Sequence, residues 1–238
     1  MLKAILFDLD GTLLQMNQDE FVKLYFTSLV KFLAGHGYEP KKLTEAMWTS
    51  IGAMIKNTGK RTNEEVFWSV FSHEYGKDMS ADEPLFERFY LEEFDNVSTV
   101  AEQFDIIPSL IKKLKGDGYK LILATNPVFP LIATKKRAAW AGIDISDFDL
   151  VTSYENSSYS KPNLDYYRSI LTTMGLSADE CLMVGNDVSE DMIAESLGIR
   201  VYLITRHLLN KNNIDITHYP QGDFHDLQRY ISELNDDK

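Results

Sequence analysis

Two acidic residues stand one residue apart, directly after an apolar run near the start of the chain. The run Ala4–Leu9 has the length and the continuous hydrophobicity of a strand buried on both faces. Asp8 and Asp10 mark its carboxyl end, where Gly11 lets the chain turn sharply. Ligands bind at this end of the strands in an open α/β sheet. Two carboxylates there suit a cation, or a nucleophile beside a general acid/base, whereas an isolated Asp-x-Asp would be a capped, solvated turn.

Three further polar groups follow apolar runs or precede a helical pattern. Each has a simple structural explanation when it is taken alone: the start of a turn, a solvated lysine, or acids favoured by a helix dipole. Their joint occurrence in this order indicates one shared site instead. The groups are Thr125-Asn126 after Tyr119–Ala124, Lys161-Pro162 before Leu164–Met174, and Asn186-Asp187 with Asp191 after Cys181–Gly185.

This ordered set resembles the four motifs of the haloacid dehalogenase superfamily, and the resemblance covers essentially the whole chain. The first motif is similar to the segment from Phe7 to Leu13, which reads FDLDGTL. The resemblance implies that Asp8 attacks phosphorus and forms an aspartyl-phosphate. It implies that Asp10 protonates the leaving alkoxide and then activates the hydrolytic water. Asp10 also favours phosphate chemistry over dehalogenation, because the dehalogenases of the superfamily lack this acid/base.

The resemblance assigns roles to the later motifs as well. Thr125 and the backbone of Asn126 would hydrogen-bond the phosphoryl oxygens, and Lys161 would neutralise charge on the nucleophile and the phosphate. A Mg²⁺ ion would be held by Asp8, by the backbone carbonyl of Asp10 and by an acid of the fourth motif. Mg²⁺ suits this role because it prefers oxygen ligands and accepts a phosphate and waters in its octahedron.

The fourth motif departs from the usual pattern of the superfamily. Gly-Asp is common there, whereas this chain has Gly185-Asn186-Asp187. Either Asp187 has taken the ligand position, or Asn186 stands where the usual aspartate does. A carboxylate is the stronger ligand for a hard cation, so we predict that Asp187 contacts the metal ion directly or through its water. Asp191 would then be an outer partner that orients Lys161 or a metal-bound water.

The elements that must position these residues alternate between strands and helices. This alternation predicts a doubly wound parallel sheet of the α/β class. Glycines at 142, 175 and 198 are typical helix C-terminal stops. The predicted strands are Ala4–Leu9, Tyr119–Ala124, Leu150–Thr152, Cys181–Gly185 and Val201–Ile204, and the predicted helices are Leu131–Ala141, Leu164–Met174 and Met192–Leu197.

Residues 17–100 show helical periodicity, dense aromatic residues and no strand-like run. Thr62 and Glu65 have the spacing of a capping box. We expect about four helices with a small core of their own, forming a cap inserted into a catalytic core of residues 1–16 and 101–238. Only 35 residues lie between Thr125 and Lys161, too few for the large cap that other subclasses of the superfamily place there.

Helical caps of this kind close over small phosphorylated metabolites, so a small substrate is expected. Lys56, Lys60 and Arg61 form a basic cluster between two predicted cap helices. Arg61 is therefore a candidate substrate-binding residue, with an ordinary solvated loop as the alternative.

Composition limits the other partners. The 238 residues carry 36 acidic side chains against 24 Lys and Arg, a net charge of −12, which argues against binding nucleic acid or an anionic membrane. Cys181 is the only cysteine, so no intrachain disulfide can form. Asp8 and Asp10 interrupt the first apolar run too early for a signal peptide, and no run is long enough to span a bilayer, so a cytoplasmic location is expected.

We therefore expect a Mg²⁺-dependent hydrolase of a small phosphate monoester. A sugar phosphomutase, which would return the phosphoryl group to its substrate, uses the same four motifs and stays an alternative. A non-catalytic phosphoryl-binding regulatory protein is a third possibility, against which the intact Asp8, Asp10, Thr125 and Lys161 speak. The sequence predicts neither the particular substrate nor the oligomeric state.

Overall fold

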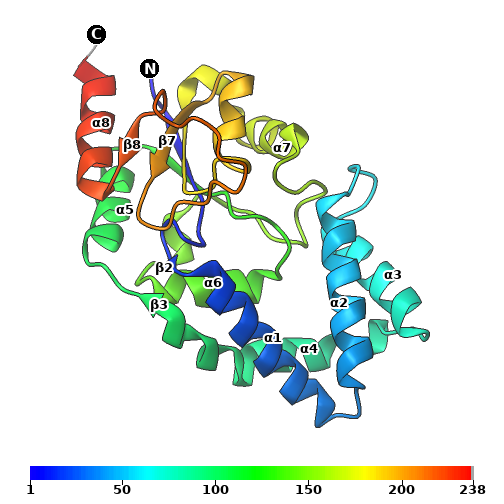
Figure 1. The fold of residues 1–238 in the computed structure, drawn as a ribbon. Coiled ribbons are helices and arrows are strands. Elements are labelled where there is room, and N and C mark those ends of the chain that lie inside the picture. The colour runs from blue at the N-terminus through cyan, green and yellow to red at the C-terminus, as the bar shows by residue number, and fades with distance from the viewer. Residues whose placement is uncertain (237–238) are drawn as a thin grey trace.

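The computed structural model describes residues 1–236 and contains a six-stranded sheet with helices on both faces (Figure 1). Every neighbouring pair of strands in this sheet is parallel, in the order β5-β4-β1-β6-β7-β8. The predicted doubly wound α/β fold is thereby confirmed. The strands are β1 (Ala4–Phe7), β4 (Lys120–Leu123), β5 (Leu150–Val151), β6 (Cys181–Gly185), β7 (Arg200–Ile204) and β8 (Gln221–Gly222).

The side chains of the central strands alternate between two apolar clusters, one on each face of the sheet. On β1, Ile5 and Phe7 belong to the cluster with α5, α6 and α8, whereas Ala4 and Leu6 pack with α7 and the 3₁₀ segment η5. All four side chains are fully buried, which explains why the run is continuously apolar. The covering elements are α5 (Ile106–Gly116), α6 (Leu131–Trp140), α7 (Leu164–Met174), η5 (Met192–Leu197) and α8 (Phe224–Asp236).

A group of helices lies to one side of the sheet, between two short strands that pair antiparallel with each other (Figure 1). The chain therefore leaves the sheet domain and returns to it at neighbouring points. The expected helical character is confirmed, and Thr62 and Glu65 form the capping box. This helical insertion consists of α1 (Gln18–Ala34), α2 (Pro40–Ile55), α3 (Asn63–Tyr75), η1 (Ser80–Asp82), α4 (Glu83–Glu92) and η2 (Phe94–Val100), between β2 (Gln15–Met16) and β3 (Ala101–Glu102).

One buried amide attaches the insertion to the sheet domain. Asn63 Nδ2 donates to the carbonyl of Pro127 at 2.9 Å and to Ser160 Oγ at 3.0 Å. Nearby, Gly59 has φ +89°, and a Cβ at this position would lie 2.1 Å from the Tyr159 hydroxyl oxygen, so only glycine fits. The loop between α2 and α3 is thus held against the two segments that carry Thr125-Asn126 and Lys161.

The structure also corrects several predicted elements. The first strand ends at Phe7, two residues earlier than expected, because the chain enters a turn at Leu9. The segment Met192–Leu197 is a 3₁₀ helix and not an α-helix. Helices α5 and α8 and strand β8 lie in stretches for which no element was predicted.

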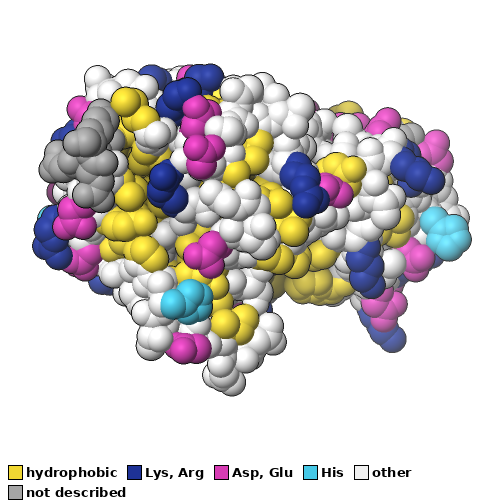
Figure 2. Space-filling model, turned by 90° about the horizontal axis from the view of Figure 1, so that it is seen from above, with side chains coloured by type: hydrophobic (Ala, Val, Ile, Leu, Met, Phe, Trp, Pro, Cys, Tyr) yellow, Lys and Arg dark blue, Asp and Glu magenta, His cyan; other side chains and the backbone are white. Residues whose placement is uncertain are grey.

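Among the described residues, no helix combines the length and the apolar character that a membrane crossing requires. On the face shown in Figure 2, Lys and Arg side chains lie singly or in small groups among Asp and Glu. That face offers no continuous basic surface of the kind that binds nucleic acid.

Candidate active site

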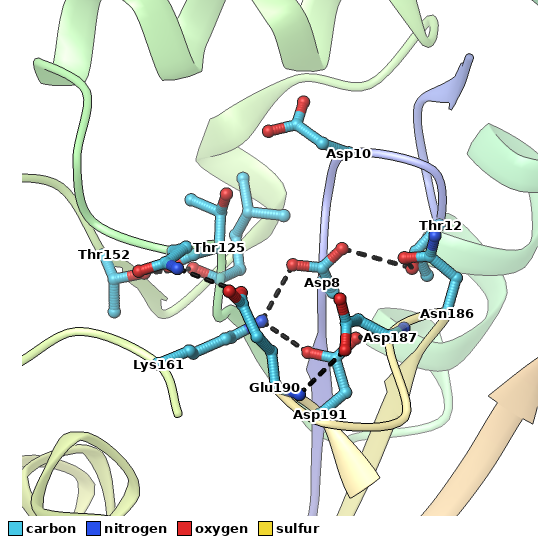
Figure 3. Close-up of polar contacts among 12 residues, drawn as sticks. Asp8, Asp10, Thr12, Thr125, Thr152, Lys161, Asn186, Asp187, Glu190 and Asp191 are labelled. Atoms are coloured by element: carbon cyan, nitrogen blue, oxygen red, sulfur yellow. Dashed lines mark hydrogen bonds and ion pairs between the residues drawn. The ribbon is translucent and has the colours of Figure 1, made fainter. Parts of the chain in front are cut away.

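The polar residues singled out in the sequence converge at the carboxyl ends of β1, β4 and β6 (Figure 3). A cavity of about 190 Å³ lies there. The strand order explains the convergence, since β4 and β6 flank β1 and all three run in the same direction. The predicted residues that line the cavity are Asp8, Asp10, Thr125, Asn126, Asn186, Asp187 and Asp191.

Lys161 bridges two carboxylates and forms with them the acid–lysine cluster (Asp8, Lys161 and Asp191). Its Nζ lies 2.8 Å from Asp8 Oδ1 and 2.6 Å from Asp191 Oδ1, and the lysine side chain is fully buried. Burial acts to lower the pKa of Lys161, but the two carboxylates outweigh it and hold the pKa well above its ordinary value. Burial raises the pKa of Asp191, whereas the neighbouring Lys161 acts to lower it. The structure thus makes Asp191 a partner of Lys161, as the spacing of the fourth motif suggested.

The second carboxylate oxygen of Asp8 is held by the first motif itself. The Thr12 hydroxyl lies 3.2 Å from Asp8 Oδ2 and 3.0 Å from Asn186 Oδ1, while Asn186 Nδ2 donates to the carbonyl of His207 at 2.6 Å. A Cβ on Gly11, which has φ +84°, would lie 2.4 Å from Asn186 Nδ2, so the glycine is required by this close approach. Asp8 is therefore fixed in one orientation at the floor of the cavity.

Asp10 pairs with an arginine that the sequence analysis missed. The guanidinium of Arg137 donates through Nη1 to Asp10 Oδ2 and through Nη2 to Thr134 Oγ1 at 3.2 Å, and it lies over the Phe129 ring at 4.3 Å from the centroid. Burial raises the pKa of Asp10, and Arg137 opposes that rise. Arg137 sits inside helix α6, between lysine and alanine, where nothing in the local sequence distinguishes it from a surface residue.

Glu190 is a second residue that the sequence analysis did not assign, although it directly precedes Asp191 of the fourth motif. Its Oε2 accepts from Asn126 Nδ2 at 2.9 Å, and burial raises its pKa to about 7. Asp187 Oδ1 accepts from the backbone N–H groups of Ser189 at 2.7 Å and of Glu190 at 2.9 Å, which fixes the loop. Carboxyl groups therefore outnumber the buried lysine on this side of the cavity.

The donor chemistry of this region fits a hard divalent cation. Asp8, Asp187, Glu190 and Asp191 line the cavity and two of them pair with Lys161, so the set is rich in oxygen and holds more acids than one lysine can neutralise. Within residues 1–236, no group of three or more His, Cys, Asp or Glu side chains is placed to hold a metal by itself. The predicted ligand set is consistent with that finding, because one of its three members is the backbone carbonyl of Asp10.

The structure does not bring the predicted basic cluster to the cavity. Lys56, Lys60 and Arg61 are exposed, and none of them lines it. The insertion instead reaches the cavity through helix α1, with Gln18, Phe21 and Val22. The helical periodicity of α1 indicated which residues would be buried, but it could not show which would face the site.

A doubly wound parallel sheet with a lysine-bridged pair of acids at the carboxyl ends of its central strands, and a helical insertion after the first strand, has the architecture of haloacid dehalogenase-type hydrolases. The chain belongs to the haloacid dehalogenase-like hydrolase family, whose family model matches residues 2–205. The resemblance seen in the four motifs is thereby confirmed.

Curated relatives and solved structures agree with this membership. The chain is 26% identical over 226 residues to a glyceraldehyde 3-phosphate phosphatase of Methanothermobacter thermautotrophicus, covering 91% of this chain and 95% of the relative. It is 25% identical over 206 residues to a phosphoglycolate phosphatase of Aquifex aeolicus, covering 85% and 84%.

Two crystal structures show the same fold. A phosphatase of this family from Thermococcus onnurineus superposes with a TM-score of 0.59 at 20% identity, over 97% of this chain and 98% of the other. The hydrolase YfnB of Bacillus subtilis, described as bound to magnesium, superposes with a TM-score of 0.55 at 20% identity, over 98% and 99%.

Proposed function

We propose that this protein is a Mg²⁺-dependent phosphatase that hydrolyses a small phosphate monoester through an aspartyl-phosphate on Asp8. The observation that carries the proposal is the acid–lysine cluster, in which Lys161 Nζ lies 2.8 Å from Asp8 Oδ1 at the floor of a cavity. The curated relatives support it, since both of those named above are phosphatases of small phosphorylated compounds.

In the first step, a carboxylate oxygen of Asp8 attacks phosphorus, and the bond between phosphorus and the ester oxygen breaks. The leaving oxygen takes a proton from Asp10. Lys161 offsets the charge of the incoming dianion, because its ammonium group already lies against the nucleophile. Thr125 and Asn126 line the same cavity and would receive the phosphoryl oxygens.

In the second step, the now ionised Asp10 takes a proton from a water molecule, and that water attacks phosphorus. The bond between phosphorus and Asp8 breaks, inorganic phosphate leaves, and Asp10 is again protonated. Asp10 Oδ1 suits both proton transfers, because among the described residues it is buried without a hydrogen-bond partner.

The residues that would hold Mg²⁺ are Asp8, the backbone carbonyl of Asp10 and Asp187. When bound, the ion supplies positive charge that offsets repulsion between the carboxylates and the phosphate. Asn186 is the weaker candidate ligand, because a neutral amide oxygen binds a hard cation less strongly than a carboxylate does. The magnesium in the YfnB structure is in keeping with this choice of metal.

The helical insertion, residues 17–100, would be a cap that closes over a small metabolite. The protein would act in the cytoplasm.

A screen of phosphorylated metabolites, scored by phosphate release with and without Mg²⁺, tests the activity. Brief incubation followed by acid quench should leave Asp8 carrying one phosphoryl group by mass spectrometry. Phosphate release at the same rate without Mg²⁺, or an Asp8 that carries no phosphoryl group after the quench, would contradict the mechanism. A requirement for a sugar bisphosphate would identify a mutase instead.

A further inference from the structure

Arg137 is the largest fully buried charged side chain of the protein, and its carboxylate partner is Asp10. Three groups restrict the orientation of its guanidinium. Nε donates to the Ala133 carbonyl at 3.4 Å, Nη2 donates to Thr134 Oγ1 at 3.2 Å, and the Phe129 ring packs against the guanidinium. An arginine fixed in this way presents Nη1 at one place and in one direction.

The two carboxyl oxygens of Asp10 differ in their partners. Its Oδ2 accepts from Arg137, whereas its Oδ1 is buried in the lining of the cavity without a partner among the described residues. A carboxyl group held by one oxygen has a fixed plane and offers the other oxygen to whatever occupies the cavity. Most buried polar atoms in proteins are hydrogen-bonded, so a carboxyl oxygen that lines the cavity without a protein partner is available to a group bound there.

We propose that Arg137 is a positioning residue, which holds the plane of the Asp10 carboxyl group so that Oδ1 faces the leaving-group oxygen of the substrate. The inference rests on the proposed function, in which Asp10 is the general acid. It assigns Arg137 no contact with the substrate.

The test compares two substrates that differ in their need for a proton. p-Nitrophenyl phosphate releases a stable phenolate without protonation, whereas an alkyl phosphate must be protonated as it leaves. Arg137→Met should lower kcat on the alkyl phosphate about 10- to 100-fold more than on p-nitrophenyl phosphate, because it releases the acid from its orientation. Arg137→Lys should restore part of the alkyl activity. Lys135→Met, at an exposed site on the same helix, is the control and should leave both rates unchanged.

A double-mutant cycle separates positioning from simple structural support. In an Asp10→Asn background, Arg137→Met should cost no more than about threefold further, since both changes remove the same proton transfer. Equal losses on the two substrates, or losses that add fully to those of Asp10→Asn, would overturn the inference. Retained activity in Asp8→Asn would contradict the proposed function itself, and so the two failures can be told apart.

The composition of the cavity lining supports a second inference, which is independent of Arg137. Phe21 and Val22 of α1, with Val128 and Phe129 of the loop after β4, contribute apolar side chains to the lining, and Gln18 adds one neutral amide. Lys161 is already paired with two carboxylates. Among the described residues that line the cavity, Lys211 is the one Lys or Arg, and it is exposed.

We infer that the alcohol released from the substrate is uncharged and partly apolar. A second anionic group would meet these apolar side chains and the carboxyl groups that also line the cavity, Asp187 among them, and both disfavour it. This inference likewise rests on the proposed function, and it distinguishes this chain from an enzyme selective for phosphoglycolate.

A matched pair of substrates tests it. 2-Hydroxyethyl phosphate and 2-phosphoglycolate share a carbon skeleton but differ in the charge of the far group. The value of kcat/KM should be at least about tenfold higher for the neutral ester. An equal or higher value for phosphoglycolate would overturn the inference, and so would a loss on Lys211→Met confined to phosphoglycolate. p-Nitrophenyl phosphate hydrolysis that depends on Asp8 checks the proposed function separately.

Discussion

The two sides of the catalytic cavity differ in composition and in the way they are built. On the sheet side, polar groups from separate loops hold one another, as when Lys161 joins Asp8 to Asp191. On the insertion side, a single helix presents Phe21 and Val22, and the Phe21 ring packs against the rings of Tyr25 and Phe129. Changes on the sheet side should therefore stop the chemistry or destabilise the fold, whereas changes on the insertion side should alter which substrate is accepted.

The largest effect is expected at the nucleophile. Asp8→Asn keeps the volume of the side chain but replaces a carboxylate with a poor nucleophile, and turnover should fall at least about 100-fold. The variant should keep a cooperative thermal unfolding transition in circular dichroism, which would show that the loss of activity is not caused by a loss of structure. Residual kcat within tenfold of wild type on p-nitrophenyl phosphate would remove Asp8 from the role.

The acid–lysine cluster should also dominate stability. Lys161→Met leaves two buried carboxylates facing each other, and breaking a buried ion pair in this way costs about 3–5 kcal/mol of unfolding free energy. Urea denaturation measures this loss. The same change at Lys3, an exposed lysine paired with Glu180, is the control and should leave the urea midpoint close to that of the wild type, because an exposed ion pair adds little to stability.

A compensating variant sharpens the test of the cluster. Adding Asp191→Asn to Lys161→Met removes one of the two unpaired charges and should recover part of the lost stability. If the double variant is no more stable than Lys161→Met alone, charge repulsion is not the cause of the loss.

In the fourth motif, Asp187 should matter more for metal binding than Asn186 does. Asp187→Ala should raise the Mg²⁺ concentration for half-maximal activity more than about tenfold, because a carboxylate binds a hard cation better than an amide does. Asn186→Ala should raise it less. A titration of activity against Mg²⁺ gives both values, and the opposite ranking would make Asn186 the ligand.

The smallest effect is expected at the exposed basic cluster of the insertion. Arg61→Ala should change kcat/KM less than about twofold and stability by no more than about 0.5 kcal/mol, as is usual for exposed residues. Selective loss on a good metabolite, with p-nitrophenyl phosphate unaffected, would show that Arg61 reaches the substrate and would contradict the assignment of the insertion's contact with the cavity to α1 alone.

The sequence allowed more to be predicted about the sheet side than about the insertion. Asp8, Thr125 and Lys161 stand beside buried strands or helix starts, so local pattern places them at one edge of the sheet. Arg137 could not be found in that way, because its contacts with Phe129 and Asp10 depend on how helix α6 packs in the fold and not on any local motif. The residues of α1 that face the cavity could not be predicted for the same reason. Burial can be read from periodicity, but the identity of the surface that covers a helix cannot.

The buried Asn63 bears on how far the insertion can be treated as an exchangeable module. Its amide reaches Pro127, next to Asn126, and Ser160, next to Lys161. An insertion grafted from a relative would therefore have to match these two sites, or leave a buried carbonyl and a buried hydroxyl unsatisfied beside the chemistry. Substrate range in this protein should evolve more readily by replacing residues within α1 than by wholesale exchange of the helices.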